Sequence, residues 1–346
     1  MTDEMFGHEH KTGARSRPRV LIAMSPTTWA QFCTPDVARR LTALADVNPF
    51  EVVEDFSAVV DLAEVEVLLT GWGCPPIDEE VLRRAPKLMA VIHAAGSVKH
   101  HVTQACWDRG ILVSSAVEEN ALPVAEFTVA AILFSQKRVL EASHAYRAGR
   151  TQLDWTAAFP SMGNYRRVVG IIGASRIGRR VIELLRPFDV DVLLADPHID
   201  EDEARQHGVT LVELDDLLAG SDTVSIHAPS LPETARMLDR RRLALMRDGA
   251  VLINTARGAL VDEEALTNEL VSGRLHAVLD VTEADVLPAE SPLWELPNVL
   301  LTPHVAGSLG GELARLVDHA LAELERWTMG QEFESSVDRD QLGSSA

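Results

Sequence analysis

Short runs of aliphatic residues recur along the chain, and the segments between them have the length of helices. The runs are RVLIAM from Arg19, EVLLTG from Glu66, MAVIHA from Met89 and ILVS from Ile111, followed from Val168 by VVGII, DVLLA, TVSIH, AVLIN, HAVLD and VLLT. Continuous apolar runs that alternate with amphipathic segments are typical of parallel strands covered by helices on both faces. The sequence therefore predicts an α/β fold.

Length and composition limit the class of protein further. A chain of 346 residues is too long for one compact core and favours two domains. The net charge of −20 argues against a nucleic-acid-binding surface. The three cysteines, Cys33, Cys74 and Cys106, lack the spacing of metal ligands and fit reduced thiols. Neither a signal peptide nor a membrane-spanning run is recognisable, so we expect a cytoplasmic protein without a metal or membrane partner.

The order of the predicted elements suggests how the chain divides. Residues 19–119 form a first α/β domain, and residues 120–304 form a second. A helical pattern from Asn120 to Gly149 lies at the crossover between them. A final helix follows the last strand, so residues 305–330 can return to the first domain. The polar residues 1–18 are predicted to be disordered, and residues 331–346 are predicted to be a frayed polar tail.

The segment GIIGASRIGRR joins a predicted strand to a predicted helix through a glycine-rich turn. Gly173 and Gly178 occupy the first and third glycines of the dinucleotide-binding pattern Gly-x-Gly-x-x-Gly, whereas Ser175 replaces the second. Backbone N–H groups of such a turn bind a pyrophosphate at the helix start. Asp196 ends the next strand, 18 residues after Gly178, close to the spacing of the acid that binds the ribose hydroxyls. A Rossmann-type, doubly wound parallel sheet that prefers NAD to NADP is therefore predicted.

Three further segments follow in a fixed order: AVLINTARGALVDEEAL, HAVLDVTEADVLP and NVLLTPHVAG. Together with GIIGASRIGRR and SIHAPSLPETARML, they make the chain resemble the D-isomer-specific 2-hydroxyacid dehydrogenases over roughly residues 60–330. The resemblance implies that residues 120–304 bind NAD. It also implies a flavodoxin-like substrate domain, made of residues 19–119 and 305–330, and a homodimer. The implied reaction interconverts a small 2-oxo acid and its D-2-hydroxy acid, as in hydroxypyruvate and glyoxylate reductases.

Reduction of a 2-oxo acid needs a cation for the carboxylate and a proton donor for the developing alkoxide. Arg257 follows the strand AVLIN and can hold a carboxylate through its planar fork, and His304 follows VLLT as the candidate acid and base. The resemblance pairs this histidine with a carboxylate, usually a Glu five positions after Asp280. Asp285 stands there, and Glu283 is a rival. An aspartate can orient a histidine, although its reach is one methylene shorter.

The resemblance also assigns the other contacts. Besides Gly173, Ser175, Gly178 and Asp196, the residues expected to contact the cofactor are Arg176, Ile177, His227, Pro229, Thr255, Ala256 and Asp280. The carboxylate of Asp280 would accept a hydrogen bond from the nicotinamide carboxamide. The residues expected to bind the substrate are Arg257 and the backbone N–H groups of Ala95, Gly96, Ser97 and Val98. Lys99, His100 or His101 either contacts the distal group of the substrate or faces solvent.

Two other functions stay open at this point. The C-terminal-binding proteins keep this fold and bind NADH, yet they act as transcriptional corepressors by recognising peptides. The chain shows neither a long extra tail nor a basic nuclear-localisation stretch, which makes this the minor alternative. Phosphoglycerate dehydrogenase is the other alternative, in a short form without a regulatory domain.

Overall fold

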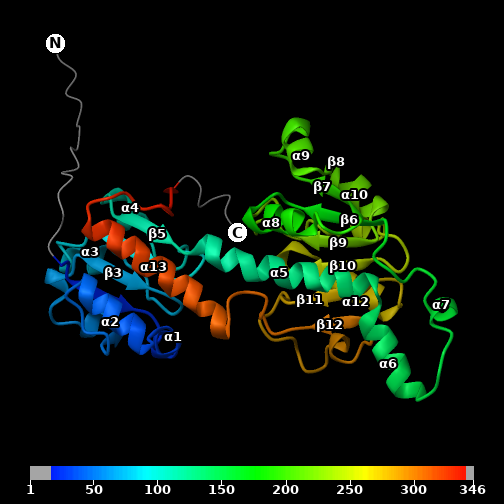
Figure 1. The fold of residues 1–346 in the computed structure, drawn as a ribbon, viewed down its shortest axis with the longest axis horizontal. Helices are drawn as coiled ribbons and strands as arrows, with labels where there is room; N and C mark the ends of the chain where they lie inside the picture. Colours follow the sequence, from blue (N-terminus) through cyan, green and yellow to red (C-terminus); the bar gives the residue numbers. More distant parts are fainter. Residues whose placement is uncertain (1–16, 340–346) are drawn as a thin grey trace, which may run out of the picture. The chain divides into compact units, whose positions relative to one another are not determined.

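The computed structural model describes residues 17–339, so most of the predicted N-terminal tail lies outside the described residues. The chain divides into two compact units (Figure 1). Among the described residues, unit 1 contains 17–120 and 309–339, and unit 2 contains Ala121–Ser308. Val305–Ser308 thus belong to unit 2, a few residues beyond the boundary expected from the sequence.

Unit 1 is built on a five-stranded parallel sheet with the order β2-β1-β3-β4-β5 (Figure 1). This is the flavodoxin-like order, in which ligands bind beyond the carboxyl ends of the strands. Helices cover both faces, so β1, β3 and β4 are buried at every position. The strands are β1 (Val20–Ala23), β2 (Val52–Val53), β3 (Val67–Thr70), β4 (Ala90–His93) and β5 (Leu112–Ser115). The helices are α1 (Pro26–Phe32), α2 (Pro35–Leu44), η1 (Phe56–Ala58), η2 (Leu62–Glu64), α3 (Glu79–Arg84), α4 (Gln104–Asp108), η5 (Gly310–Glu312) and α13 (Leu313–Thr328).

The C-terminal part of the chain completes unit 1. α13 buries one face, including Leu316, Ala320 and Leu324, in the same core cluster as α1 and α2. Residues 331–339 do not form the frayed tail expected from their polar composition. Ser115 N donates to Ser335 O at 3.2 Å and Val337 N donates to Val113 O at 2.8 Å, so this segment pairs with β5. The prediction failed because backbone pairing at a sheet edge needs few apolar side chains.

Unit 2 is built on a seven-stranded parallel sheet with the order β12-β11-β10-β9-β6-β7-β8. Starting from β6, this is the Rossmann order with one added edge strand. The strands are β6 (Arg167–Ile172), β7 (Val190–Ala195), β8 (Thr210–Leu211), β9 (Thr223–Ile226), β10 (Val251–Asn254), β11 (His276–Leu279) and β12 (Val299–Leu301). The helices are α6 (Val139–Gly149), α7 (Trp155–Ala158), α8 (Arg176–Leu185), α9 (Glu201–His207), α10 (Leu214–Gly220), α11 (Arg240–Leu243), η3 (Gly258–Leu260), α12 (Glu263–Val271) and η4 (Pro292–Trp294).

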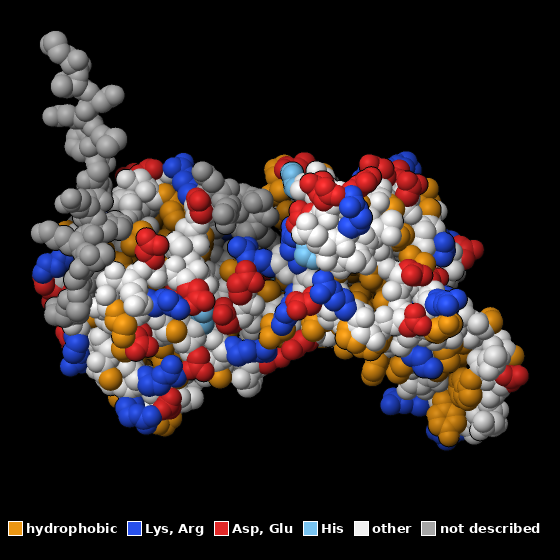
Figure 2. Space-filling model, turned by 45° about the horizontal axis from the view of Figure 1, so that its top comes forward, with side chains coloured by type: hydrophobic (Ala, Val, Ile, Leu, Met, Phe, Trp, Pro, Cys, Tyr) orange, Lys and Arg blue, Asp and Glu red, His pale blue; other side chains and the backbone are white. Residues whose placement is uncertain are grey.

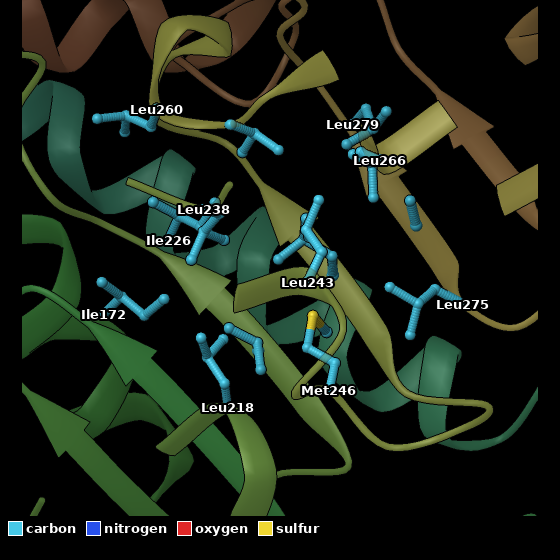
Figure 3. Packing of buried hydrophobic residues seen from close by; sticks show 14 of the residues in the cluster. Ile172, Leu218, Ile226, Leu238, Leu243, Met246, Leu260, Leu266, Leu275 and Leu279 are labelled. Atoms are coloured by element: carbon cyan, nitrogen blue, oxygen red, sulfur yellow. The ribbon is translucent and has the colours of Figure 1, made fainter. Parts of the chain in front are cut away.

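The sheet of unit 2 carries a hydrophobic cluster on each face. On one face, Leu279 of β11 lies beside Leu266 of α12, and Ile226 of β9 lies beside Leu238 (Figure 3). The opposite face packs against α8 and the long helix α5 (Val117–Gln136), which begins in unit 1. Continuous apolar strands follow from this burial on both sides, and the predicted α/β fold is confirmed.

The helical pattern from Asn120 to Gly149 is interrupted in the structure. α5 ends at Gln136 and α6 begins at Val139, because Arg138 adopts a left-handed conformation with φ of +49°. No residue of α6 is buried. Hydrophobic side chains lie on the surface of this part of unit 2 (Figure 2). Tyr146 of α6 meets Trp155 of α7 edge to face, with 6.1 Å between the ring centroids. No helix among residues 17–339 is both long and apolar enough to cross a membrane.

Candidate active site

The glycine-rich turn lies between β6 and α8, and backbone geometry explains both of its glycines. Gly173 has φ of +95°, and a Cβ there would lie 2.7 Å from the backbone nitrogen of Ala228. A Cβ on Gly178 would lie 2.1 Å from Gly173 O. Ser175 has φ of −63° and caps α8, since its hydroxyl accepts from Gly178 N at 3.3 Å. The position of the second glycine therefore imposes no steric need for glycine.

Asp196 follows β7 and turns back to this glycine-rich turn. Its carboxylate accepts a hydrogen bond from Ala174 N at 2.7 Å and another from His198 N at 2.8 Å. A carboxylate has about four acceptor sites, so Asp196 keeps capacity for two further donors, such as ribose hydroxyls. The close-packed turn, the start of α8 and this acid match what a dinucleotide requires. Of the residues expected at the pyrophosphate, Arg176 is exposed and Ile177 is half-buried.

Arg257 follows β10 in a turn held by a buried side chain. Asn254, the last residue of β10, accepts from Ala256 N at 3.0 Å and donates to Arg257 O at 2.9 Å. Surrounding protein partly desolvates the guanidinium and lowers the pKa of Arg257, although the residue remains solvent-accessible. The next residue, Gly258, permits a close approach, because a Cβ there would lie 2.1 Å from Thr282 O. The loops after β10 and β11 are thereby in contact.

His304 follows β12 in a strained turn that Asp280 holds. The φ of His304 is +55°, an uncommon value for a residue with a side chain. The buried Asp280 carboxylate accepts from Thr302 Oγ1 at 2.6 Å, Val305 N at 2.8 Å and Ala306 N at 2.9 Å. The N–H of His304 donates to Asp280 O at 3.0 Å. Asp280 thus fixes the backbone on both sides of an exposed imidazole.

Asp285 and His304 are not joined in this structure. Both side chains are exposed, and no hydrogen bond or ion pair links them within residues 17–339. The rival carboxylate, Glu283, forms an ion pair with Arg236 at 3.0 Å. Its N–H also donates to the Glu263 carboxylate at 2.7 Å. The carboxylate of Glu283 therefore pairs with Arg236 and not with the imidazole of His304, whereas the carboxylate of Asp285 is exposed.

The remaining residues expected near the nicotinamide lie at the carboxyl ends of β9 and β10. Burial lowers the pKa of His227 to about 3, so its imidazole is neutral, and its Nε2 lies 2.9 Å from Ser225 Oγ. Thr255 and Ala256 are buried, and Thr255 Oγ1 lies 3.0 Å from Thr128 Oγ1 of α5. Pro229 is half-buried. The contacts of His227 and Thr255 hold the edge of unit 2 in shape.

In unit 1, the loop expected to bind the substrate carboxylate follows β4. Ser115, the last residue of β5, donates to Ala95 O at 3.2 Å and lies 2.5 Å from Gly96 O. The carbonyl groups of the loop are thus engaged. The backbone N–H groups of Ala95, Gly96 and Ser97 have no acceptor in the described part of the chain. This arrangement leaves several donors for an anion.

The side chain of His101 is buried, so it neither faces solvent nor lies at the surface of this loop. It is 3% exposed, and its Nε2 lies 3.3 Å from Thr70 Oγ1. Lys99 and His100 are exposed. No local pattern in the sequence indicates the inward position of His101, because its partner Thr70 lies on a different strand. Asn254, Ser115 and Thr302 were also missed, since short polar residues at strand ends are common in loops of every kind.

The fold defines the class first: this is a two-domain α/β protein with a dinucleotide-binding sheet. The family model of the D-isomer specific 2-hydroxyacid dehydrogenase NAD binding domain matches residues 129–306. A glyoxylate reductase of Korarchaeum cryptofilum is 34% identical over 81% of this chain and 82% of its own length. The chain belongs to the D-isomer-specific 2-hydroxyacid dehydrogenase family, and unit 2 holds its NAD-binding domain.

Other members of the family are also similar to this chain. D-3-phosphoglycerate dehydrogenase of Mycobacterium leprae is 36% identical over 78% of this chain but only 50% of its own length. The chain thus spans about half the length of the phosphoglycerate dehydrogenases it matches. The solved structure of D-lactate dehydrogenase from Aquifex aeolicus, complexed with NAD and lactic acid, superposes with a TM-score of 0.69 at 28% identity. That comparison covers 90% of this chain and 96% of the other.

Proposed function

We propose that the protein uses NAD to interconvert a small 2-oxo acid and its D-2-hydroxy acid. One observation carries the proposal: Arg257, Asp285 and His304 follow β10, β11 and β12, three adjacent parallel strands. The carboxyl ends of such strands lie at one edge, where α/β proteins bind ligands. A fixed cation, a carboxylate and an imidazole at one edge are what the reduction of a keto acid requires.

In the reductive direction, the bound cofactor supplies the hydride. Arg257 then pairs with the substrate carboxylate and polarises the ketone, because its guanidinium carries a permanent charge. His304 donates the proton to the oxygen of the reduced carbon and accepts it back in the oxidative direction. The strained turn around His304 limits the orientations of the imidazole, since the Asp280 carboxylate accepts from the amides of the next two residues, Val305 and Ala306.

Asp285 is proposed to stabilise the cationic form of His304 once substrate and cofactor are bound. The exposed loop that carries Asp285 must then shift, because the two side chains do not touch in this structure. Apo active sites often hold catalytic hydrogen bonds in loose geometry that tightens in the complex. The shorter aspartate makes this shift larger than it would be for a glutamate.

The substrate is proposed to be small, as in glyoxylate or hydroxypyruvate. The backbone N–H groups of Ala95, Gly96 and Ser97 would receive its carboxylate from unit 1. We also propose that the protein is a homodimer and acts in the cytoplasm. All three cysteines lack a disulfide, which fits a reducing compartment.

The function is tested by measuring the rate of NADH oxidation in the presence of each of five 2-oxo acids. These are glyoxylate, hydroxypyruvate, pyruvate, phenylpyruvate and 3-phosphohydroxypyruvate. We expect turnover with glyoxylate or hydroxypyruvate, and much weaker turnover with NADPH. His304→Gln should lower kcat by about a hundredfold to ten-thousandfold, the usual value of general acid catalysis. The Kd for NADH should stay unchanged, because the glycine-rich turn is untouched. Absence of turnover with all five acids would refute the proposed function.

The role of Asp285 has its own test. Asp285→Asn should lower kcat and shift its pH profile, because the cationic imidazole loses its partner. Asp285→Glu restores the missing methylene and should keep or raise kcat. Glu283→Gln is the matched control and should leave both quantities unchanged. An unaltered pH profile in Asp285→Asn would show that the assignment to Asp285 is wrong.

A further inference from the structure

The loop after β4 in unit 1 is fastened at both ends by buried polar side chains. We propose that Thr70, His93 and His101 form a clamp that holds residues 94–101 in the shape that binds the substrate carboxylate. These three are positioning residues, since none of them is proposed to touch the substrate. The inference rests on the proposed function, because it assigns a role to the loop that would receive the carboxylate.

The geometry of the clamp centres on one hydroxyl group. Thr70 is the last residue of β3, and its Oγ1 lies 2.9 Å from Nδ1 of His93, the last residue of β4. The same oxygen lies 3.3 Å from Nε2 of His101. The two imidazole rings approach to 4.5 Å between centroids. One hydroxyl therefore joins the residue before the loop to the residue at its end.

A single hydroxyl proton imposes order on this contact. The proton goes to one neighbour only, which is His93 Nδ1, His101 Nε2 or Ile92 O at 3.5 Å, so at least one imidazole must donate to Thr70 Oγ1. Burial lowers the pKa of His93 well below its ordinary value, and burial together with His100 lowers that of His101 to about 4. Neutral imidazoles are consequently the forms present near pH 7.

Backbone contacts around the clamp support the same role. Ala94 N donates to Thr70 O at 2.8 Å, and Ile77 N donates to His101 O at 2.8 Å. Between these fixed points, Ser115 holds the carbonyl oxygens of Ala95 and Gly96. These two carbonyls are thus turned toward the sheet, and the N–H groups of Ala95, Gly96 and Ser97 are left for an anion. Three neighbouring strands, β3, β4 and β5, each contribute their last side chain to this arrangement.

The clamp predicts a specific pattern in variants of Thr70. Thr70→Val keeps the shape and removes the hydroxyl, so the loop should gain freedom and the KM for glyoxylate should rise about tenfold, equivalent to about 1.4 kcal/mol. The kcat should change less than about threefold. The Kd for NADH should not change, because the dinucleotide turn lies in unit 2. Thr70→Ser restores the hydroxyl and should return KM to the wild-type value.

Ser115 and Ser114 offer a matched pair on β5. Both are buried, but Ser115 bonds the loop, whereas Ser114 Oγ has no partner within residues 17–339. Ser115→Ala should raise KM as Thr70→Val does, and Ser114→Ala should leave it unchanged. Equal effects of Ser114→Ala and Ser115→Ala would contradict the proposed use of the loop.

Hydrogen exchange separates the clamp from the proposed function. In Thr70→Val, the amides of residues 94–101 should exchange faster, and in Thr70→Ser they should exchange as in the wild type. This result requires no turnover, so it can be obtained even if no 2-oxo acid is reduced. A folded Thr70→Val protein with wild-type exchange in this loop would overturn the clamp. Failure of the wild type to reduce any acid would instead overturn the function.

Discussion

The turn Gly173–Gly178 and the loop Ala94–His101 both follow a buried strand of a parallel sheet, yet different forces shape them. In the turn, the backbone itself leaves no room for a side chain at Gly173 or Gly178. In the loop, Gly96 has no positive φ, and side chains of three strands fix the backbone. The shape of the turn therefore depends on the absence of side chains at its two glycines. The shape of the loop depends on several polar contacts that must form together.

This difference predicts which substitutions each region tolerates. A turn without room for side chains loses its shape when a Cβ is added at one of its glycines. It tolerates a substitution at a position whose φ and ψ suit any residue. Ser175 is such a change, because its φ of −63° suits any residue. A loop that depends on polar contacts can replace its glycines, provided that new partners hold the backbone.

The largest loss of affinity for NADH is expected from a substitution at Gly178, where an added Cβ makes the shortest contact in the turn. Gly178→Ala places a Cβ 2.1 Å from Gly173 O, so the backbone of the turn must move. Overpacking of this kind costs about 1–3 kcal/mol, and we expect the affinity for NADH to fall by about tenfold to a hundredfold. Fluorescence titration with NADH measures the effect.

Gly149→Ala in α6 is the matched control. A Cβ there would meet only Thr151 Cγ2 at 3.7 Å, an ordinary contact. Its affinity for NADH should equal that of the wild type. If Gly178→Ala also binds NADH normally, excluded volume does not define the turn.

A smaller, pH-dependent effect is expected where side chains fasten unit 1. His319 of α13 lies 3.0 Å from the Glu119 carboxylate. Burial alone lowers the pKa of His319, but the hydrogen bond to Glu119 and the charges of Glu119, Glu323 and Glu334 outweigh it and raise the pKa above 6.5. The stabilisation is complete below pH 6.5 and is lost as pH rises through the folded pKa. We expect the loss to be about 1 kcal/mol.

Thermal unfolding between pH 6 and pH 9 measures this loss. Tm should fall over this interval in the wild type, and it should fall less in His319→Gln, which cannot titrate. Glu119→Gln should give the same flattened profile. In the glycine-rich turn of unit 2, the cap of α8 is the uncharged Ser175, so we expect its contribution to stability not to depend on pH in this range. Identical pH profiles in all three proteins would show that the pair does not stabilise unit 1.

The smallest effect is expected at Ser175. Ser175→Gly restores the glycine usual in this pattern and removes only the capping hydroxyl, at a cost of a few tenths of a kcal/mol. The affinity for NADH should stay within about tenfold of the wild type, a change of roughly 1.4 kcal/mol at most. Ser175→Ala should destabilise α8 by about 1 kcal/mol. A much larger loss of affinity in Ser175→Gly would mean that the hydroxyl itself binds a phosphate.

Features set by local sequence patterns could be predicted, and features set by contacts between distant segments could not. Buried strands and the glycine-rich turn depend on local patterns, so both sheets and the family could be recognised from the sequence. The two-residue strands β2 and β8 were missed, because so few residues give no alternation. The break at Arg138 and the inward position of His101 were missed as well. Each depends on contacts between segments that are distant in the sequence.

The most direct test of the central claim follows the hydride and the stereochemistry together. Hydroxypyruvate is reduced with NADH that carries deuterium at the transferable position of the nicotinamide, and the product is analysed by mass spectrometry and chiral chromatography. We predict D-glycerate with one deuterium at the reduced carbon, and no product with His304→Gln above a hundredth of the wild-type rate. L-glycerate, or a product without deuterium, would contradict the account.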